Sequence, residues 1–258
     1  MKVNLNVVIF SSTNLFENNK RKLDNKKIQV LLCRQKDKLF FPAFDVDNTK
    51  NIYDIVKNKL EIILKTNEFY IEQLYTWGEK EYYTKDNEIS ISYMVIINEE
   101  KSNKIDNGYG WYKIDIEDLS ESATNKIQKF YLYNEKFKYD FKVTTVREKN
   151  GISIRYLHSF DDDSILGLNH SIILVTALKR LRSNLNNTDL AYKFLPESFT
   201  LTELQQIHEV ILDKKLDKGN FRKKVSGMLV STEEKTNGSA HRPSAYFKLD
   251  PNWIKDYV

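Results

Sequence analysis

The chain has 258 residues, of which 41% are hydrophobic and 29% charged, and its formal net charge is +4 at pH 7. This composition excludes a disordered chain, and the length favours two domains over one small module. The single cysteine, Cys33, excludes an intrachain disulfide and a cysteine-rich zinc site, and its apolar surroundings predict a buried thiol. No apolar run approaches the ~20 residues of a membrane-spanning helix, so we expect a cytoplasmic protein with no membrane partner.

The surplus of positive charge lies in the C-terminal third. Residues 170–258 contain 14 Lys and Arg against 10 Asp and Glu, whereas the preceding residues are balanced. A basic region of this kind suits contact with phosphates. The surplus is too small to identify a nucleic-acid site by itself.

The first 160 residues alternate between strand-like and helix-like patterns, which predicts an α/β or α+β domain. Residues 164–185 then predict a long helix that joins this domain to the rest of the chain. The expected elements are strands at 3–10, 28–34 and 88–97, a helix at 51–65, a strand-like segment at 108–115 that enters a short turn or helix, and a hairpin of 141–148 with 152–158 around Asn150-Gly151.

The last sixty residues predict a winged helix-turn-helix. Thr200 and Glu203 form a capping box at the start of an amphipathic helix. Asp217 then caps a second helix, from Lys218 to about Met228, which buries an apolar stripe at Phe221, Val225 and Met228. A hairpin with Asn237-Gly238 near its tip follows, in the place of a wing.

The outer face of this second helix has the side chains that a recognition helix needs. Long cations suit phosphates and guanine, and an amide suits adenine. The alternative is a solvated basic face on an ordinary three-helix domain; for His241 the alternative is packing at the start of a strand. The candidate DNA-binding residues are Lys218, Asn220, Arg222, Lys223 and Lys224 in the helix, with His241 and Arg242 in the wing.

Several segments together resemble one family. FLPESFTLTELQQIHEVILDKKLDKGNFRKKV followed by HRPSAYFKL is similar to the C-terminal domain of the Nudix-related transcriptional regulators, and YIEQLYTWG, EISISYMVII, GWYKID and NHSIILVTALKRLRSNL have counterparts upstream in the same order. The resemblance implies a Nudix-like αβα sandwich with a mixed sheet at 1–163, a linker helix at 164–186 and a winged helix-turn-helix at 187–258. It also implies a repressor that binds a double-stranded DNA operator as a homodimer.

The chain departs from the family's catalytic motif. Active Nudix hydrolases carry a glycine, then a glutamate after five intervening residues, and then a helix with an Arg-Glu pair and a Glu-Glu pair whose carboxylates bind Mg²⁺. Without gaps, these positions fall on Phe44, Lys50, Asn58 with Lys59, and Ile62 with Ile63, and only Leu60 fits. We therefore expect no hydrolysis, no metal and no cofactor. A second group, His158 with Asp161, Asp162 and Asp163, is more typical of a solvated acidic loop than of a metal site.

The metal ligands are lost while the scaffold is retained. This combination suits a sensor that binds a small metabolite without turnover. The resemblance implies a sugar, a sugar phosphate or an ADP-ribose-like nucleotide as effector. Aromatic walls with a few polar groups are typical of small-molecule sites. On this basis the candidate effector-binding residues are Arg34, Phe44, Tyr75, Trp77 and Tyr93, the alternative being that the aromatics belong to the core.

Two other functions remain open at this point. One is a Nudix hydrolase of nucleoside-diphosphate derivatives with rearranged metal ligands. The other is a winged helix that binds protein and has no DNA affinity, since such folds are reused.

Overall fold

A computed structural model describes residues 2–15, 25–46, 50–78, 88–101, 105–150, 153–160, 165–167, 170–185, 189–236 and 243–253. Its largest element is a ten-stranded sheet of order β10-β9-β8-β7-β2-β1-β6-β5, with β3 paired to β2 and β4 to β1. The strands are β1 Lys2–Leu15, β2 Asn25–Gln35, β3 Lys38–Phe40, β4 Ala43–Asp45, β5 Tyr70–Trp77, β6 Glu88–Ile96, β7 Tyr109–Glu121, β8 Asn125–Tyr133, β9 Lys138–Asn150 and β10 Ser153–Phe160.

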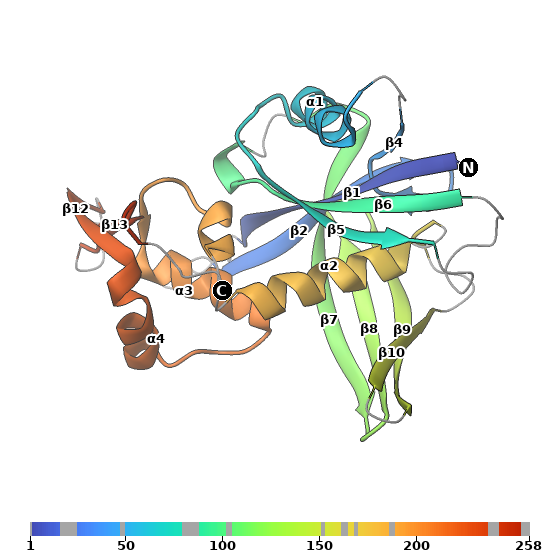
Figure 1. The fold of residues 1–258 in the computed structure, drawn as a ribbon. Helices are drawn as coiled ribbons and strands as arrows, with labels where there is room; N and C mark the ends of the chain where they lie inside the picture. Colours follow the sequence, from blue (N-terminus) through green and yellow to red (C-terminus); the bar gives the residue numbers. More distant parts are fainter. Residues whose placement is uncertain are drawn as a thin grey trace.

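The sheet is mixed and lies between two helices. β1 and β6 are parallel, whereas β1 and β2, like the other neighbours along the sheet, are antiparallel. Helix α1 (Ile52–Leu64) covers one face and α2 (His170–Asn184) the other (Figure 1). Alternate residues of β1 supply the two cores, Leu5 and Val7 toward α1 and Val8 and Phe10 toward α2. The expected αβα sandwich with a mixed sheet is confirmed.

Helix α1 follows its sequence pattern closely. The Asn51 side chain accepts the Tyr53 N–H at 2.9 Å and caps the helix, which ends where Lys65 adopts left-handed backbone with a φ of 53°. The buried stripe that fixes the helix on the sheet consists of Ile55, Val56, Leu60, Ile63 and Leu64. The expected helix at 51–65 is therefore correct to within one residue at each end.

Helix α2 begins later than the sequence predicts. The expected helix from residue 164 is wrong for residues 165–167, because this segment pairs with β3. The Leu39 N–H donates to the Ile165 carbonyl, and the Gly167 N–H donates to the Leu39 carbonyl, both at 2.9 Å. Gly167 suits this close approach, because a Cβ there would lie 2.1 Å from the Phe40 ring.

Two further expectations need correction. The segment at 108–115 does not enter a turn or helix, because β7 continues to Glu121 and pairs along β8 with a bulge between Asp118 and Ser120. Cys33 is only partly buried, at the point where β2 pairs with β3. Even this partial burial raises the pKa of the Cys33 thiol, which disfavours the reactive thiolate.

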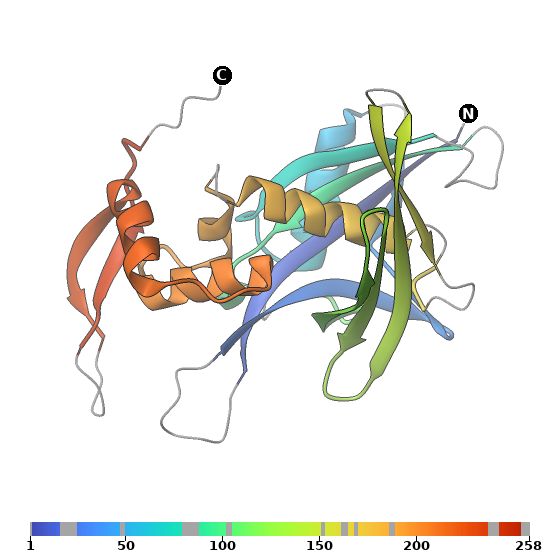
Figure 2. The same cartoon turned by 90° about the horizontal axis from the view of Figure 1, so that it is seen from below.

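The C-terminal region forms a winged helix, which stands to one side of the sheet (Figure 2). Its small sheet has the order β11-β13-β12. The remaining elements of the chain are η1 Glu99–Lys101, η2 Leu190–Phe194, β11 Phe199–Thr200, α3 Leu201–Leu212, α4 Lys218–Val225, η3 Ser226–Met228, β12 Leu229–Lys235 and β13 Ala245–Leu249. The expected helix to Met228 thus ends as α-helix at Val225, and its last three residues form a 3-10 turn.

One continuous hydrophobic cluster joins the sheet, α2 and the winged helix. It runs from Val8 and Phe10 in β1 through Leu174 and Leu181 in α2 to Phe221 in α4. The expected domain limits at 163 and 186 stay a prediction. Among the described residues, no helix is long and apolar enough to cross a membrane.

Candidate nucleic-acid interface

The turn between α3 and α4 is organised by Glu209. Its carboxylate accepts the Leu216 N–H at 3.0 Å and the Gln205 side-chain amide at 2.9 Å, and it pairs with the Lys215 ammonium at 2.9 Å. Burial alone would raise the pKa of this carboxyl, but these donors lower it below its usual value. Because Glu209 stays ionised, the turn that fixes the direction of α4 is held at neutral pH.

Helix α4 is held at its start and on one face. The Asp217 side chain accepts the Asn220 N–H at 2.9 Å, which confirms the predicted cap. Phe221 and Val225 are buried, and the Phe221 ring meets the edge of His208 at 5.0 Å between centroids. Burial lowers the pKa of His208, and its Nδ1 lies 2.9 Å from the Leu204 carbonyl. A neutral histidine therefore supports the inner side of α4.

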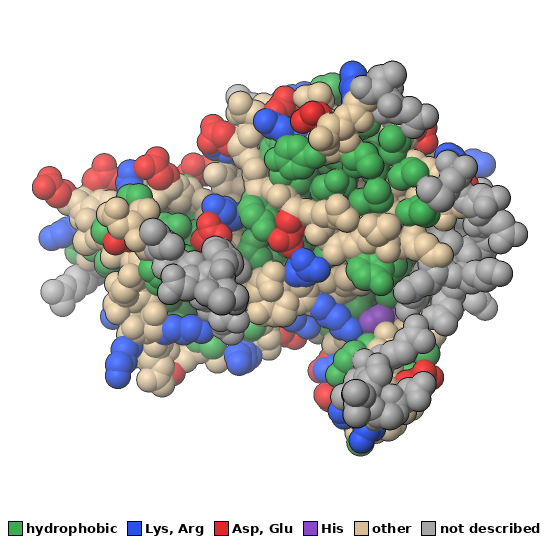
Figure 3. All heavy atoms as spheres, viewed as in Figure 1, with side chains coloured by type: hydrophobic (Ala, Val, Ile, Leu, Met, Phe, Trp, Pro, Cys, Tyr) green, Lys and Arg blue, Asp and Glu red, His purple; other side chains and the backbone are tan. Residues whose placement is uncertain are grey.

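The outer face of α4 is cationic and open to solvent. The sequence of α4, KGNFRKKV, contains no acidic residue. Within the described part of the chain, no carboxylate forms an ion pair with Lys218, Arg222 or Lys223. Lys and Arg side chains gather around α4 on the lower left of the molecule (Figure 3). The exposed residues of α4 are Lys218, Gly219, Asn220, Arg222, Lys223 and Lys224, which include all five predicted contacts of this helix.

The wing is described in its strands. β12 and β13 are antiparallel, and the Thr236 N–H donates to the Ser244 carbonyl at 2.9 Å. The predicted wing residues His241 and Arg242 lie outside the described residues. β12 exposes Glu233 and Glu234, so the cationic surface is centred on α4.

The predicted effector-binding residues lie in three places. Tyr75 and Trp77 are neighbours at the end of β5, with ring centroids 4.6 Å apart. Trp77 is buried on the α2 face of the sheet, where its Nε1 donates to the Ser92 hydroxyl at 2.9 Å. Tyr75 is 42% exposed, so this pair has a buried member and an accessible member.

The other three predicted residues lie apart from that pair. Phe44 and Tyr93 belong to the core on the α1 face, and burial raises the pKa of Tyr93. The Arg34 guanidinium lies 4.4 Å from the centre of the Phe137 ring, and its Nε donates to the Lys36 carbonyl. The structure therefore does not gather the five residues into one cleft.

Of the positions aligned with the Nudix motif, Phe44 lies in β4, Lys50 just precedes α1, and Asn58, Lys59, Ile62 and Ile63 lie on α1. Lys50, Asn58 and Lys59 are exposed. Ile62 is 68% exposed, whereas Ile63 is 6% exposed and packs under the helix. Glu61, the carboxylate beside these positions, lies 4.0 Å from the Lys57 ammonium. The residues at these positions do not present the oxygen ligands that a hard divalent cation needs.

His158 makes ordinary polar contacts. Its ring nitrogens lie 2.9 Å from the Thr145 hydroxyl and 2.9 Å from the Lys179 ammonium. Burial and the nearby Lys179 lower the pKa of His158 to about 4. Asp161, Asp162 and Asp163 lie outside the described residues, and among the residues that are described no group of three His, Cys, Asp or Glu is placed to hold a metal.

The sequence interpretation missed the residues that support the interface from below. Glu209, His208 and Arg182 have no motif of their own, although Gln205 and Glu209 at i and i+4 suggest a side-chain pair. The Arg182 Nε donates to the Ile211 carbonyl in the last turn of α3 at 2.9 Å. Contacts across 29 positions of the sequence cannot be inferred from local periodicity.

The fold is a mixed sheet between two helices, as in Nudix-like domains, followed by a winged helix. Residues 191–249 match the family model of the NrtR DNA-binding winged helix domain. The resemblance to the Nudix-related transcriptional regulators is confirmed.

Known structures share the whole architecture. A MutT/nudix family protein from Enterococcus faecalis superposes with a TM-score of 0.64 at 17% identity, over 96% of this chain and 88% of the other. NrtR of Shewanella oneidensis, in complex with a 27mer DNA, gives a TM-score of 0.62 at 19% identity, over 96% and 94%.

A curated relative matches part of the chain. The ADPR responsive transcriptional repressor NtrR of Acinetobacter baylyi (strain ATCC 33305 / BD413 / ADP1) is 34% identical over 94 residues. The match spans 36% of this chain and 36% of the relative.

Proposed function

We propose that this protein is a DNA-binding transcriptional repressor whose Nudix-like domain senses a small metabolite without hydrolysing it. The observation that carries the proposal is the outer face of α4, whose cations have no acidic residue beside them in the helix. The match of residues 191–249 to a DNA-binding winged helix domain and the curated repressor support it. The proposed division is a sensor at 1–163, a linker at 164–186 and a DNA-binding domain at 187–258.

In this proposal, α4 enters the major groove. Arg222 and Lys223 reach guanine edges or phosphates, and Asn220 suits adenine. Gly219 lets the backbone approach the DNA closely. Lys218 and Lys224 contact phosphates, and His241 and Arg242 contact the backbone or minor groove from the wing. Two copies of the chain read two half-sites about one helical turn apart, so the acting form is a homodimer.

In the sensor, the proposed effector is an ADP-ribose-like nucleotide, a sugar or a sugar phosphate. The curated repressor is ADPR responsive, which favours the first of these. The exposed Ile62 and Lys59 stand where a hydrolase has magnesium ligands, and this supports binding without turnover. Of the predicted effector contacts, the Tyr75 and Trp77 pair is the better candidate for an aromatic wall, with Arg34, Phe44 and Tyr93 further away.

The DNA part of the proposal is tested by fluorescence anisotropy with the protein's own upstream region and a scrambled duplex of the same length. We expect specific binding that weakens as salt rises. Arg222→Ala is expected to cost about 1–3 kcal/mol of binding free energy and Lys223→Ala to reduce the salt slope by about one. Lys59→Ala, an exposed lysine on α1, is the matched control and leaves binding unchanged.

The sensor part is tested separately. ADP-ribose, pentoses and sugar phosphates are titrated into the preformed complex, and release by one of them identifies the effector. The same mixtures are assayed for AMP with Mg²⁺ or Mn²⁺. AMP formation at an enzymatic rate would replace the sensor by a hydrolase with rearranged ligands. Specific DNA binding without AMP formation supports the proposal. A DNA affinity that depends neither on the sequence of the duplex nor on the salt concentration contradicts it.

A further inference from the structure

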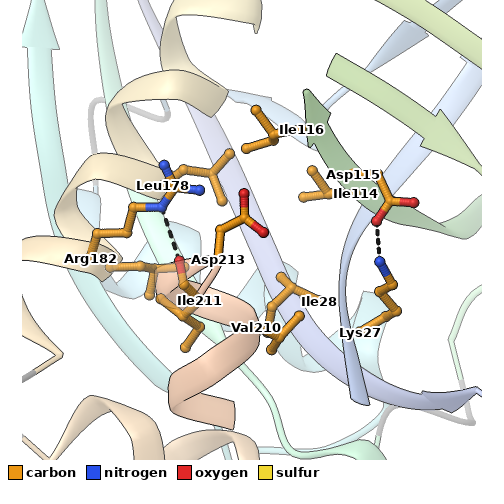
Figure 4. Close-up of a pocket in the computed structure, with 11 residues that line it drawn as sticks. Lys27, Ile28, Ile114, Asp115, Ile116, Leu178, Arg182, Val210, Ile211 and Asp213 are labelled. Atoms are coloured by element: carbon orange, nitrogen blue, oxygen red, sulfur yellow. Dashed lines mark hydrogen bonds and ion pairs between the residues drawn. The ribbon is translucent and has the colours of Figure 1, made fainter. Parts of the chain in front are cut away.

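A cavity lies where the sheet, α2 and α3 meet. It has a volume of about 270 Å³ and is formed by residues from β2, β7, α2 and the end of α3 (Figure 4). Seven of its eleven lining residues are apolar, while polar atoms contribute at least half of its surface. The apolar lining consists of Ile28, Ile114, Ile116, Leu178, Leu181, Val210 and Ile211, and several of these belong to the continuous core.

Four charged residues complete the lining, and they differ in how they are paired. Lys27 and Asp115 form an ion pair with each other. Arg182 uses its Nε to bind the Ile211 carbonyl, and its two terminal nitrogens have no hydrogen-bond partner among the described residues. The Asp213 carboxylate also has none within that part of the chain, and in Figure 4 both side chains extend toward the cavity. The Arg182 charge also helps to lower the pKa of Asp118, which is not a lining residue. The terminal nitrogens of Arg182 and the Asp213 carboxylate can still form hydrogen bonds with a ligand.

The geometry points to a ligand site: we propose that this cavity binds a small zwitterion with an apolar body, of which an apolar α-amino acid is the simplest example. The ligand's carboxylate would accept from the terminal nitrogens of Arg182, and its ammonium would donate to Asp213. Its apolar body would lie on Ile28, Ile114 and Val210. A simple anion suits the cavity less well, because Asp213 and Asp115 line it too.

The size of the cavity separates this site from the proposed effector site. Pockets that hold drug-sized ligands occupy about 300–1,000 Å³, so a dinucleotide-like molecule such as ADP-ribose exceeds this cavity. The site is also linked to the DNA-binding face. Arg182 binds the last turn of α3, and Asp213 adopts left-handed backbone at the end of that helix, with a φ of 53°. An occupied cavity therefore bears on the turn that positions α4; this regulatory role rests on the proposed function, whereas ligand binding itself does not.

The test is isothermal titration of the full chain with L-leucine, without DNA. We expect saturable binding, reduced about tenfold or more for N-acetyl-leucine, which lacks the ammonium, and for isoamylamine, which lacks the carboxylate. Arg182→Gln is expected to weaken leucine binding by a similar factor, with partial recovery in Arg182→Lys. Ile116→Trp fills the cavity and is expected to abolish binding, and thermal melting verifies that each variant is folded.

Arg222→Gln is the matched control on α4. It is expected to lose DNA affinity and keep leucine binding, so failure of the DNA-binding proposal and failure of this site can be told apart. No saturable leucine binding by the folded protein would overturn the site. So would equal binding by wild type and a folded Ile116→Trp variant, or binding that ignores loss of the ammonium and the carboxylate.

Discussion

Helices α1 and α4 both present lysines to solvent, in different electrostatic surroundings. On α1, Lys57 lies 4.0 Å from Glu61, and Asp54 is exposed in the first turn. On α4, the cations follow one another in a helix with no acidic residue. Their anchoring also differs: five buried residues hold α1 to the sheet, whereas Phe221 and Val225 hold α4.

The difference shows how the same residue type serves two purposes. A lysine beside a carboxylate on a well-anchored helix is part of a solvated face, and the pair contributes little to stability. Cations that follow one another in a helix without acidic residues create a positive potential for which phosphates are the complementary charge. The number of lysines therefore says less about a helix than the acidic residues between them and the depth of its apolar anchor.

The strongest test of the α1 half of this comparison replaces the two isoleucines that stand at the Nudix Glu-Glu positions. Ile63→Glu places a charge under the helix and is expected to cost roughly 3–5 kcal/mol in the free energy of unfolding. Ile62→Glu, at a site that is 68% exposed, is expected to change it by less than about 0.5 kcal/mol. Urea denaturation measures both, and equal costs would show that the two sides of α1 are not distinguished by burial.

On α4, the corresponding test removes the main anchor. Phe221→Ala is expected to cost about 3–5 kcal/mol, because it leaves a cavity beside His208. Since α4 has few other buried contacts, DNA affinity should fall with it, while β1 and β6 stay protected from hydrogen exchange. Retention of full DNA affinity by Phe221→Ala would contradict the assignment of α4 as the recognition helix.

Acid is expected to loosen α4 locally through His208, whereas α1 itself contains no histidine. Burial lowers the pKa of His208 in the folded state, so the unfolded chain binds a proton first as pH falls. The contribution of neutral His208 to the free energy of unfolding is complete above the histidine pKa of the unfolded chain, about 6.5. Below that pH it is lost, by up to about 1.4 kcal/mol per pH unit. Hydrogen exchange over 218–225 and 52–64 at pH 7.5 and 5.5, corrected for intrinsic rates, measures the difference; His208→Gln should remove it.

The smallest expected effect concerns the two helix caps, whose removal distinguishes a loss of stability from a loss of DNA binding. Asn51 and Asp217 cap α1 and α4 in the same way, each through a backbone N–H that its side chain accepts. Asn51→Ala and Asp217→Ala should each cost about 1 kcal/mol of stability. Only Asp217→Ala should weaken DNA binding, because it frays the first turn of α4, the proposed recognition helix. A parallel loss of affinity in Asn51→Ala would mean that DNA binding reports general stability.

Local chemistry made the helices of this chain predictable. The capping box of Thr200 and Glu203 and the cap at Asp217 fix where α3 and α4 begin, and both starts were predicted to the residue. The N-terminal extension of α2 was predicted wrongly, because the apolar character of Ile165 and Leu166 does not show that their backbone pairs with β3. The fold class followed from periodicity and from the resemblance.

The sites were less accessible to sequence reasoning. The exposed face of α4 follows from a helical wheel once Phe221 is assigned to the core. The aromatics carry no such information, because Trp77 faces the α2 side of the sheet whereas Phe44 and Tyr93, on other strands, face the α1 side. The cavity beside Arg182 is formed by four segments that are distant in the sequence, so no local sequence pattern predicts it.

Helix α2 is attached at both ends and therefore couples the large sheet to α3. Its N-terminal side is connected to the large sheet through the Leu166 bridge, and near its other end Arg182 binds the last turn of α3. Fifteen residues of α-helix span about 22 Å, so a tilt of about 5° at the sheet displaces the far end by about 2 Å. A rigid helix held at both ends therefore converts a small rearrangement at the large sheet into a displacement of the winged helix. A displacement of this size is comparable to the positional accuracy that a side chain needs to contact a base edge.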